Sequence, residues 1–171
     1  MWNWEAVSAI GQLVGAIAVV STLIYFAVQV RYAKLSAADN NRLARARGVT
    51  DYFLKAAASP EIRAANTKAW KMEGFYEEVG KELGVTADEA CILDHCHGYW
   101  FWLHWGQFTS TTEERDLEEL RSMVRKFYAA PNVRLFWEKS PVVKSLLDQP
   151  FVDFVDEVLA RHDAAMQAKS A

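Results

Sequence analysis

Apolar positions are distributed unevenly along the chain, and the longest uninterrupted apolar run lies near its start. Residues 6–30 read AVSAIGQLVGAIAVVSTLIYFAVQV, with no charge between Glu5 and Arg31. As a helix this run is about 37 Å long, enough to cross a hydrocarbon core of roughly 30 Å with some tilt. The pattern predicts a transmembrane span over 6–30 within a membrane anchor over 1–32.

Aromatic and basic residues flank this run in the positions of membrane-interface anchors. Trp2 and Trp4 precede it, and Arg31, Tyr32 and Lys34 follow it. Further arginines follow the run and none precedes it. The positive-inside rule therefore predicts that the N-terminus lies outside and that the rest of the chain after the span lies in the cytoplasm. A cleaved signal peptide is one alternative, but it needs a basic start, whereas this chain begins MWNWE. A buried core helix is the other.

Small and polar residues recur at intervals of three and four within the span, which places them on one stripe of a helix. The stripe comprises Ser8, Gly11, Gln12, Gly15, Ala18 and Thr22. Gly11 and Gly15 form a GxxxG pair, which lets a second transmembrane helix approach closely. The predicted partners are integral membrane protein subunits or further copies of this chain. The competing explanation is that glycine is simply frequent in membrane helices.

The remaining sequence has helix periodicity and no segment that alternates like a strand. Helix starts are indicated by Ser59 with Pro60, by Thr86 with Glu89, and by Thr111 with Glu114. The predicted fold is all-α with about seven helices: a helical extension or connector over 33–58 and a cytoplasmic bundle over 59–171. Residues 71–85, which contain three glycines, are the least regular stretch.

Charge and motifs narrow the function classes. The net charge of −3 provides no basic field for nucleic acid. The chain has no GxSxG, GxxxxGK[ST], GxGxxG or HExxH motif. These motifs mark several common enzyme classes, so we expect no catalytic activity. Its two cysteines do not make a disulfide framework, which is consistent with a reducing compartment.

Residues 91–105, CILDHCHGYWFWLHW, contain both cysteines, three histidines and three tryptophans. On a helix, Cys91 and His95 lie about 40° apart and His97 and His104 about 20° apart, but the two pairs face roughly opposite sides. One metal therefore collects at most two of these ligands, whereas structural zinc requires four. We expect no bound metal or cofactor. The segment is predicted to be the central helix of the bundle, with these four residues as the remaining metal or haem candidates.

Both ends of the chain resemble a widespread group of uncharacterised bacterial proteins. The start, WEAVSAIGQLVGAIAVVSTLIYFAVQVR, is similar to that group's W-E-x-[IV]-x-A-I-G-x-x-[IV]-G-A-I-A-V-V span, and PNVRLFWEKSPVVKSLLDQPFVDFVDEVL is similar to its ending. The resemblance implies a single-span inner-membrane protein with an α-helical cytoplasmic domain. It implies no catalytic residues.

Together these features predict a non-catalytic scaffold or accessory subunit of the bacterial inner membrane. Its span and aromatic-rich bundle would associate with a larger complex, respiratory or photosynthetic for example, or with its own copies. The alternative is a metal-, haem- or pigment-binding membrane protein that uses the Cys/His-rich helix.

Overall fold

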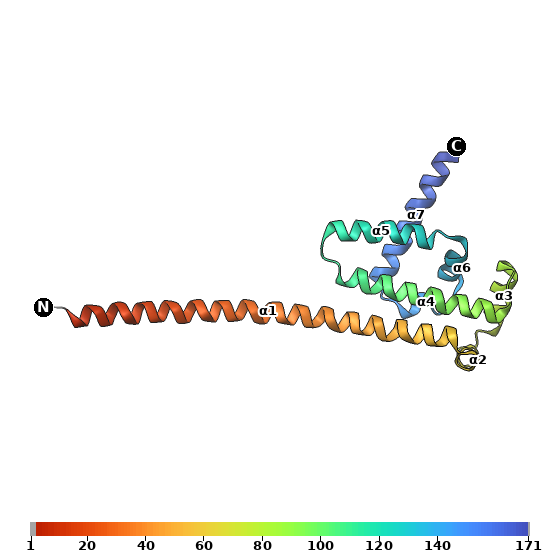
Figure 1. The fold of residues 1–171 in the computed structure, drawn as a ribbon. Helices are drawn as coiled ribbons and strands as arrows, with labels where there is room; N and C mark the ends of the chain where they lie inside the picture. The colour runs from red at the N-terminus through yellow and green to blue at the C-terminus, as the bar shows by residue number, and fades with distance from the viewer. Residues whose placement is uncertain (1–2, 171) are drawn as a thin grey trace. The chain divides into compact units, whose positions relative to one another are not determined.

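The computed structural model describes residues 3–170, and this range is helical with short connections and no strand. The helices are α1 (Trp4–Ala58), α2 (Pro60–Ala69), α3 (Glu73–Leu83), α4 (Ala87–Ser110), α5 (Glu114–Tyr128), α6 (Pro131–Lys139) and α7 (Gln149–Ser170), with a 3₁₀ turn, η1, at Lys144–Leu146 (Figure 1). The predicted all-α class is confirmed.

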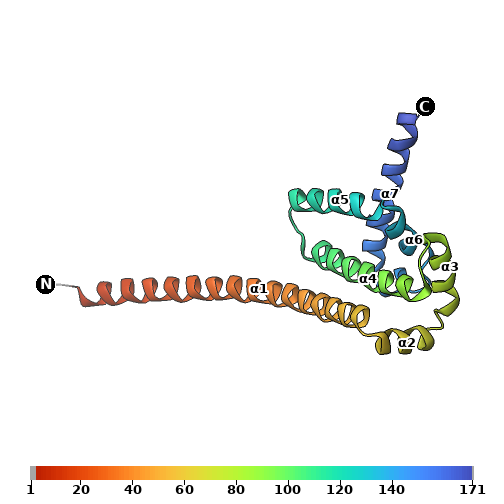
Figure 2. The same cartoon turned by 45° about the vertical axis from the view of Figure 1, so that its right-hand side comes forward.

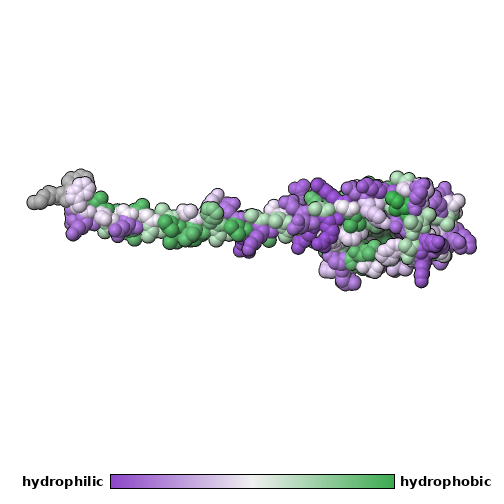
Figure 3. Space-filling view, turned by 90° about the horizontal axis from the view of Figure 1, so that it is seen from below, coloured by the Kyte–Doolittle hydropathy of each residue, from purple (hydrophilic) through white to green (hydrophobic). Residues whose placement is uncertain are grey.

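The chain divides into two compact units, Met1–Asn41 and Arg42–Ala171. The described part of the first unit is the N-terminal portion of α1, along which hydrophobic residues predominate (Figure 3). The second unit contains the rest of α1 and all later helices. The sequence suggested a boundary between connector and bundle at residue 58, whereas the contacts assign 42–58 to the same unit as α2–α7.

Local capping signals account for two of the helix starts. Ser59 Oγ accepts a hydrogen bond from the Ile62 amide at the start of α2. Thr86 and Glu89 form the predicted capping box of α4, in which each side chain bonds the other residue's backbone amide. These two predictions are confirmed.

Two other local predictions were wrong. The Thr111–Glu114 box does not form: Glu113 is the N-cap of α5 without a side-chain bond, and Thr111 ends α4, with its hydroxyl donating to the Gln107 carbonyl at 2.7 Å. The stretch judged least regular, 71–85, is mostly α3. Gly84 ends that helix with φ at 70°, a left-handed conformation that glycine adopts without strain.

Helix α4 is central to the second unit, where it contacts α2, α3, α5 and α6 (Figures 1 and 2). Aromatic side chains from several helices fill the core around it, and Phe101, Tyr128, Trp137 and Phe151 are at most 1% exposed. Helix α7 packs on α5 through its first half, which contains the buried Val155, Val158 and Leu159. Beyond these residues α7 is mainly exposed.

The last turns of α1 approach α4 closely at two glycines. A Cβ built on Gly98 would lie 2.5 Å from the Phe53 ring, and one on Gly106 would lie 3.0 Å from Ala46 Cβ. Real Cβ atoms do not approach carbon to 2.5 Å, so the Phe53 ring occupies space that only glycine leaves free. These contacts attach residues 42–58 to the bundle.

Candidate functional site

The first candidate site is the apolar surface of α1. Every large hydrophobic side chain from Val7 to Leu35 is at least 44% exposed. This is the single helix within the described residues that is long and apolar enough to span a membrane. A helix that is apolar on all sides and covered by no other element is typical of a membrane span rather than of a soluble core.

The interface anchors predicted from sequence lie on both sides of this surface. Trp4 is 76% exposed at the first residue of α1, and Arg31, Tyr32 and Lys34 are exposed after the apolar run. Trp2 lies outside the described residues.

The small-residue stripe of α1 is exposed in the structure. Its members Ser8, Gly11, Gln12, Gly15, Ala18 and Thr22 are all solvent-exposed. A Cβ added to Gly11 or Gly15 would meet nothing within 4 Å, so the backbone is open to a neighbouring helix there. Thr22 donates its hydroxyl to the Ala18 carbonyl at 2.8 Å and therefore needs no hydrogen-bond partner from another helix.

The second candidate site is the Cys/His-rich helix α4. His97 and His104 are buried, 6% and 4% exposed, and the Phe127 ring contacts both imidazoles with centroid separations of 6.2 and 5.5 Å. Burial lowers the pKa of each histidine to about 4. Both imidazoles are therefore neutral at neutral pH and fill an aromatic core.

Cys91 and His95 come together on another face of α4. His95 Nδ1 lies 3.6 Å from Cys91 Sγ and 2.7 Å from the Cys91 carbonyl oxygen, to which it donates. Burial opposes protonation of His95, but these bonds to Cys91 outweigh it and raise the pKa of the imidazole. The thiol also contacts Thr67 Oγ1 at 3.5 Å. Across the described residues, no group of three or more His, Cys, Asp or Glu side chains is placed to hold a metal ion.

Asp94 is the most unusual group on this helix, because it is a buried carboxyl with an incomplete set of partners. Tyr76 of α3 donates its hydroxyl to Oδ2 at 2.7 Å. Oδ1 has no hydrogen-bond partner among the residues that the structure describes. Burial raises the pKa of Asp94, although the Tyr76 hydrogen bond and the nearby His95 charge both act to lower it. Burial next to this carboxyl also raises the pKa of Tyr76.

A pocket of about 130 Å³ opens beside this carboxyl. Its polar lining is Asn66, Tyr76, Asp94 and His95. Its apolar walls come from the end of α1, from the connection between α2 and α3, and from Val142 and Leu146 around η1. A smaller cavity of about 40 Å³, which reaches Gly98 and Trp102, shares Asp94 with it. The Asp94 carboxyl therefore borders two cavities, and the larger one is close to the volume that a benzene-sized molecule occupies.

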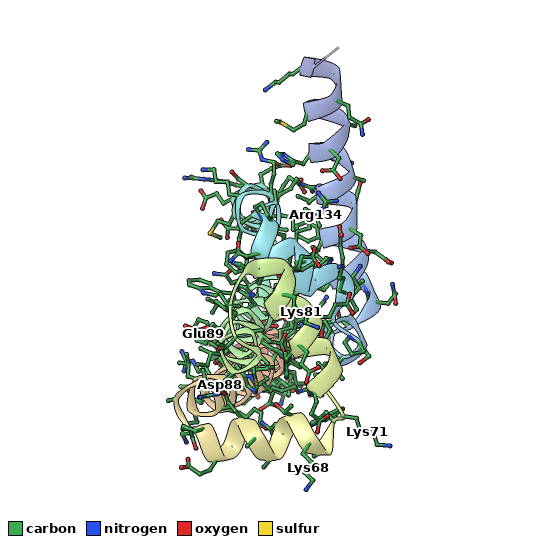
Figure 4. The ribbon with its side chains drawn as sticks, turned by 90° about the vertical axis from the view of Figure 1, so that its right-hand side faces the viewer. Lys68, Lys71, Lys81, Asp88, Glu89 and Arg134 are labelled. Atoms are coloured by element: carbon green, nitrogen blue, oxygen red, sulfur yellow. The ribbon has the colours of Figure 1, made fainter. Side chains whose placement is uncertain are left out.

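A salt bridge joins α2 to the start of α4 in the same part of the bundle. The buried Arg63 guanidinium donates from Nε and Nη2 to Asp88 at 2.9 and 2.8 Å and from Nη1 to the Ala57 carbonyl at 2.6 Å. Figure 4 shows this end of the bundle, with Asp88 and Glu89 at the start of α4, Lys68 in the last turn of α2 and Lys71 in the connection after it. These bonds hold the Arg63 guanidinium against Asp88 and the Ala57 carbonyl.

Sequence reasoning found Cys91, His95, His97 and His104 but not the pocket. Asp94 carried a signal, since it is a lone acid in an otherwise apolar helical stretch. Tyr76 carried none, because it belongs to the stretch that was judged irregular. Comparison with protein-family models, with curated proteins and with solved structures found no match.

Proposed function

We propose that this chain is a non-catalytic, single-span accessory or scaffold protein of the bacterial inner membrane, with its N-terminus outside and its helical bundle in the cytoplasm. The observation that supports it most directly is the uncovered apolar surface of α1. From Val7 to Leu35 this surface includes thirteen Val, Leu, Ile and Phe side chains, each roughly half exposed. Transferring them from water to hydrocarbon is favourable by about 10–20 kcal/mol.

That transfer free energy favours a bilayer over water as the surroundings of this helix. It matches or exceeds the net stability of a typical domain, about 5–15 kcal/mol. A helix that left this surface in water would aggregate. The proposed orientation rests on Arg31, Lys34 and the later arginines. These basic residues all follow the span, and the positive-inside rule places that side in the cytoplasm.

Within the membrane, the proposed contact is the stripe around Gly11 and Gly15. Lipid tails give no hydrophobic drive for helix association, so close backbone packing at small residues is what favours a partner helix. The partner is an integral membrane subunit of a larger assembly or a second copy of this chain. The bundle supplies the cytoplasmic part of the same assembly.

The anchor and its topology are tested by carbonate extraction of membranes and by reporter fusions at each terminus. We expect the chain to stay in the membrane pellet, with a C-terminal fusion active only as a cytoplasmic reporter. Release by carbonate would contradict the anchor, and an externally active C-terminal fusion would contradict the orientation.

Association is tested by replacing both Gly11 and Gly15 with leucine and measuring complex size by native mass spectrometry in detergent. We expect loss of the assembly while membrane insertion is kept. The matched control is Ala9→Leu with Ala16→Leu, which adds similar bulk about 120–140° away around the helix. Equal complex size in all three proteins would refute the glycine interface. Stoichiometric metal or chromophore in the purified protein would instead favour the Cys/His helix as a cofactor site.

A further inference from the structure

The pocket beside Asp94 has a lining that selects for charge as well as for size. Its walls include the aromatic rings of Tyr52, Phe53, Trp70 and Tyr76. Aromatic faces carry negative electrostatic potential and attract cations, most strongly when the cation is partly desolvated. Trp70 is 57% and Tyr52 47% exposed, so the pocket is open to solvent on the side where these rings lie.

The carboxyl of Asp94 provides the matching anchor. It is 9% exposed, its Oδ2 is bonded by Tyr76, and its Oδ1 lacks a partner among the described residues. A buried polar atom without a hydrogen bond costs about 1–3 kcal/mol, and more when it is charged. An ionised carboxylate only accepts hydrogen bonds, so the group that completes this site in its ionised form is a donor.

Among the residues that the structure describes, no lysine or arginine fills that role. None of the described residues that line the pocket is lysine or arginine. His95 also lines it, but its Nδ1 donates to the Cys91 carbonyl. The titratable groups that face the Asp94 carboxyl are therefore Tyr76, which already donates to it, and His95.

The volume limits the size of the ligand. A cavity of about 150 Å³ accommodates a benzene molecule, and the pocket with its neighbouring cavity offers about 130 and 40 Å³. Both are well below the roughly 300–1,000 Å³ of sites for drug-sized ligands. A fitting molecule has one charged head and a compact apolar body of a few carbon atoms.

We propose that this pocket binds a small primary alkylammonium ion, whose NH₃⁺ group donates to Asp94 and whose apolar body lies against the aromatic walls. The inference concerns the bundle alone and holds whether or not the membrane scaffold function is correct. Such a ligand would supply the buried carboxyl with the partner that Oδ1 lacks among the described residues. The ammonium stabilises the ionised carboxylate, which burial alone disfavours.

The test uses the full chain in detergent at pH 8, where an alkylamine keeps its proton. Isobutylammonium chloride is titrated while tryptophan fluorescence is recorded, and protein-free micelles are subtracted. Isobutanol, which has the same carbon skeleton without charge, is the matched control ligand. We expect saturable binding of the ammonium and at least about tenfold weaker binding of the alcohol.

Two variants locate the site. Asp94→Asn keeps the shape and the Tyr76 contact but removes the charge, and should weaken ammonium binding at least about tenfold. Trp70→Ala removes an exposed ring and should weaken it about two- to fivefold. Trp100→Ala, which removes a 42% exposed tryptophan that does not line this pocket, is the matched control and should bind normally.

The outcomes are decisive even if Asp94→Asn fails to fold, because Trp70→Ala and the alcohol control do not depend on it. Equal binding of alcohol and ammonium would overturn the proposal, since the carboxylate would then play no part. Absence of saturable ammonium binding to the unmodified chain would overturn it as well. Equal loss of binding in Trp70→Ala and Trp100→Ala would place any binding elsewhere.

Discussion

Acidification should destabilise the bundle through His97 and His104. Both imidazoles are buried among aromatic rings, and burial lowers the pKa of each from 6.5 to about 4. Between these two values the unfolded chain holds a proton that the folded chain does not. Stability is therefore complete above pH 6.5 and is lost as the pH falls towards 4.

The magnitude follows from the two pKa values. Lowering the pH from 7 to 5 should cost about 2 kcal/mol for each histidine, or about 3–4 kcal/mol for both. This is a large share of a typical domain stability of about 5–15 kcal/mol. The contact that Asn132 Nδ2 makes with His97 Nε2 at 3.5 Å adds to the cost, because an amide NH₂ donates only to an unprotonated nitrogen.

Asp94 and His95 act in the opposite direction. Each has a raised pKa, so the folded chain holds its proton more tightly and gains stability as the pH falls through that pKa. The pH dependence of the unmodified protein alone is therefore a sum of opposing contributions. A comparison with the variant that carries His97→Phe and His104→Phe cancels the contributions of Asp94 and His95.

The assay is guanidinium unfolding of the full chain in detergent, followed by tryptophan fluorescence at pH 7 and pH 5. Between these values the unmodified chain should lose about 3–4 kcal/mol more stability than the double variant, and each single variant should recover about half. Any constant effect of the larger phenylalanine rings cancels in this difference. If the unmodified chain and the double variant show the same pH dependence, the two histidines are not buried as neutral groups and the reasoning fails.

Two further predictions concern the stability of the same unit, Arg42–Ala171. Gly98→Ala should destabilise the bundle by about 1–3 kcal/mol, because its Cβ would lie 2.5 Å from the Phe53 ring, and Phe53→Leu in the same chain should recover part of the loss in thermal unfolding. Equal stability of Gly98→Ala and the unmodified chain would contradict this close approach. Arg63→Ala should cost about 1–3 kcal/mol by guanidinium unfolding, because it removes all the hydrogen bonds to Asp88 and the Ala57 carbonyl. Arg63→Lys should not restore full stability, since an ammonium cannot reproduce the bidentate geometry, and full rescue would show that charge alone matters.

The proposed ligand site adds a condition to the pH measurement. A bound ammonium would stabilise the ionised form of Asp94 and so lower its pKa. The unfolding experiments should therefore be carried out in buffers without primary amines. Repeating them with isobutylammonium gives a second readout of binding, because a ligand that binds only the folded state raises its stability.

The helical class and several helix starts could be predicted from the sequence. The apolar run, the cap at Ser59 and the Thr86–Glu89 box depend on residues within a few positions of one another, and the structure contains all three. The Thr111–Glu114 box has the same pattern but did not form, because the Thr111 hydroxyl bonds the carbonyl of Gln107 at the end of α4 instead. A pattern read over four residues does not show which of two competing local bonds is made.

The spacing of 91–105 determined that Cys91 faces His95 and that four ligand-type residues do not converge on one point, because helical geometry sets both. Only the tertiary structure decided what surrounds them. Tyr76 of α3 donates to Asp94, Phe53 near the end of α1 lies against Gly98, and Phe127 of α5 contacts both His97 and His104. These contacts join residues far apart in the chain, so the free energy that places a buried carboxyl beside a pocket depends on packing that no local pattern encodes.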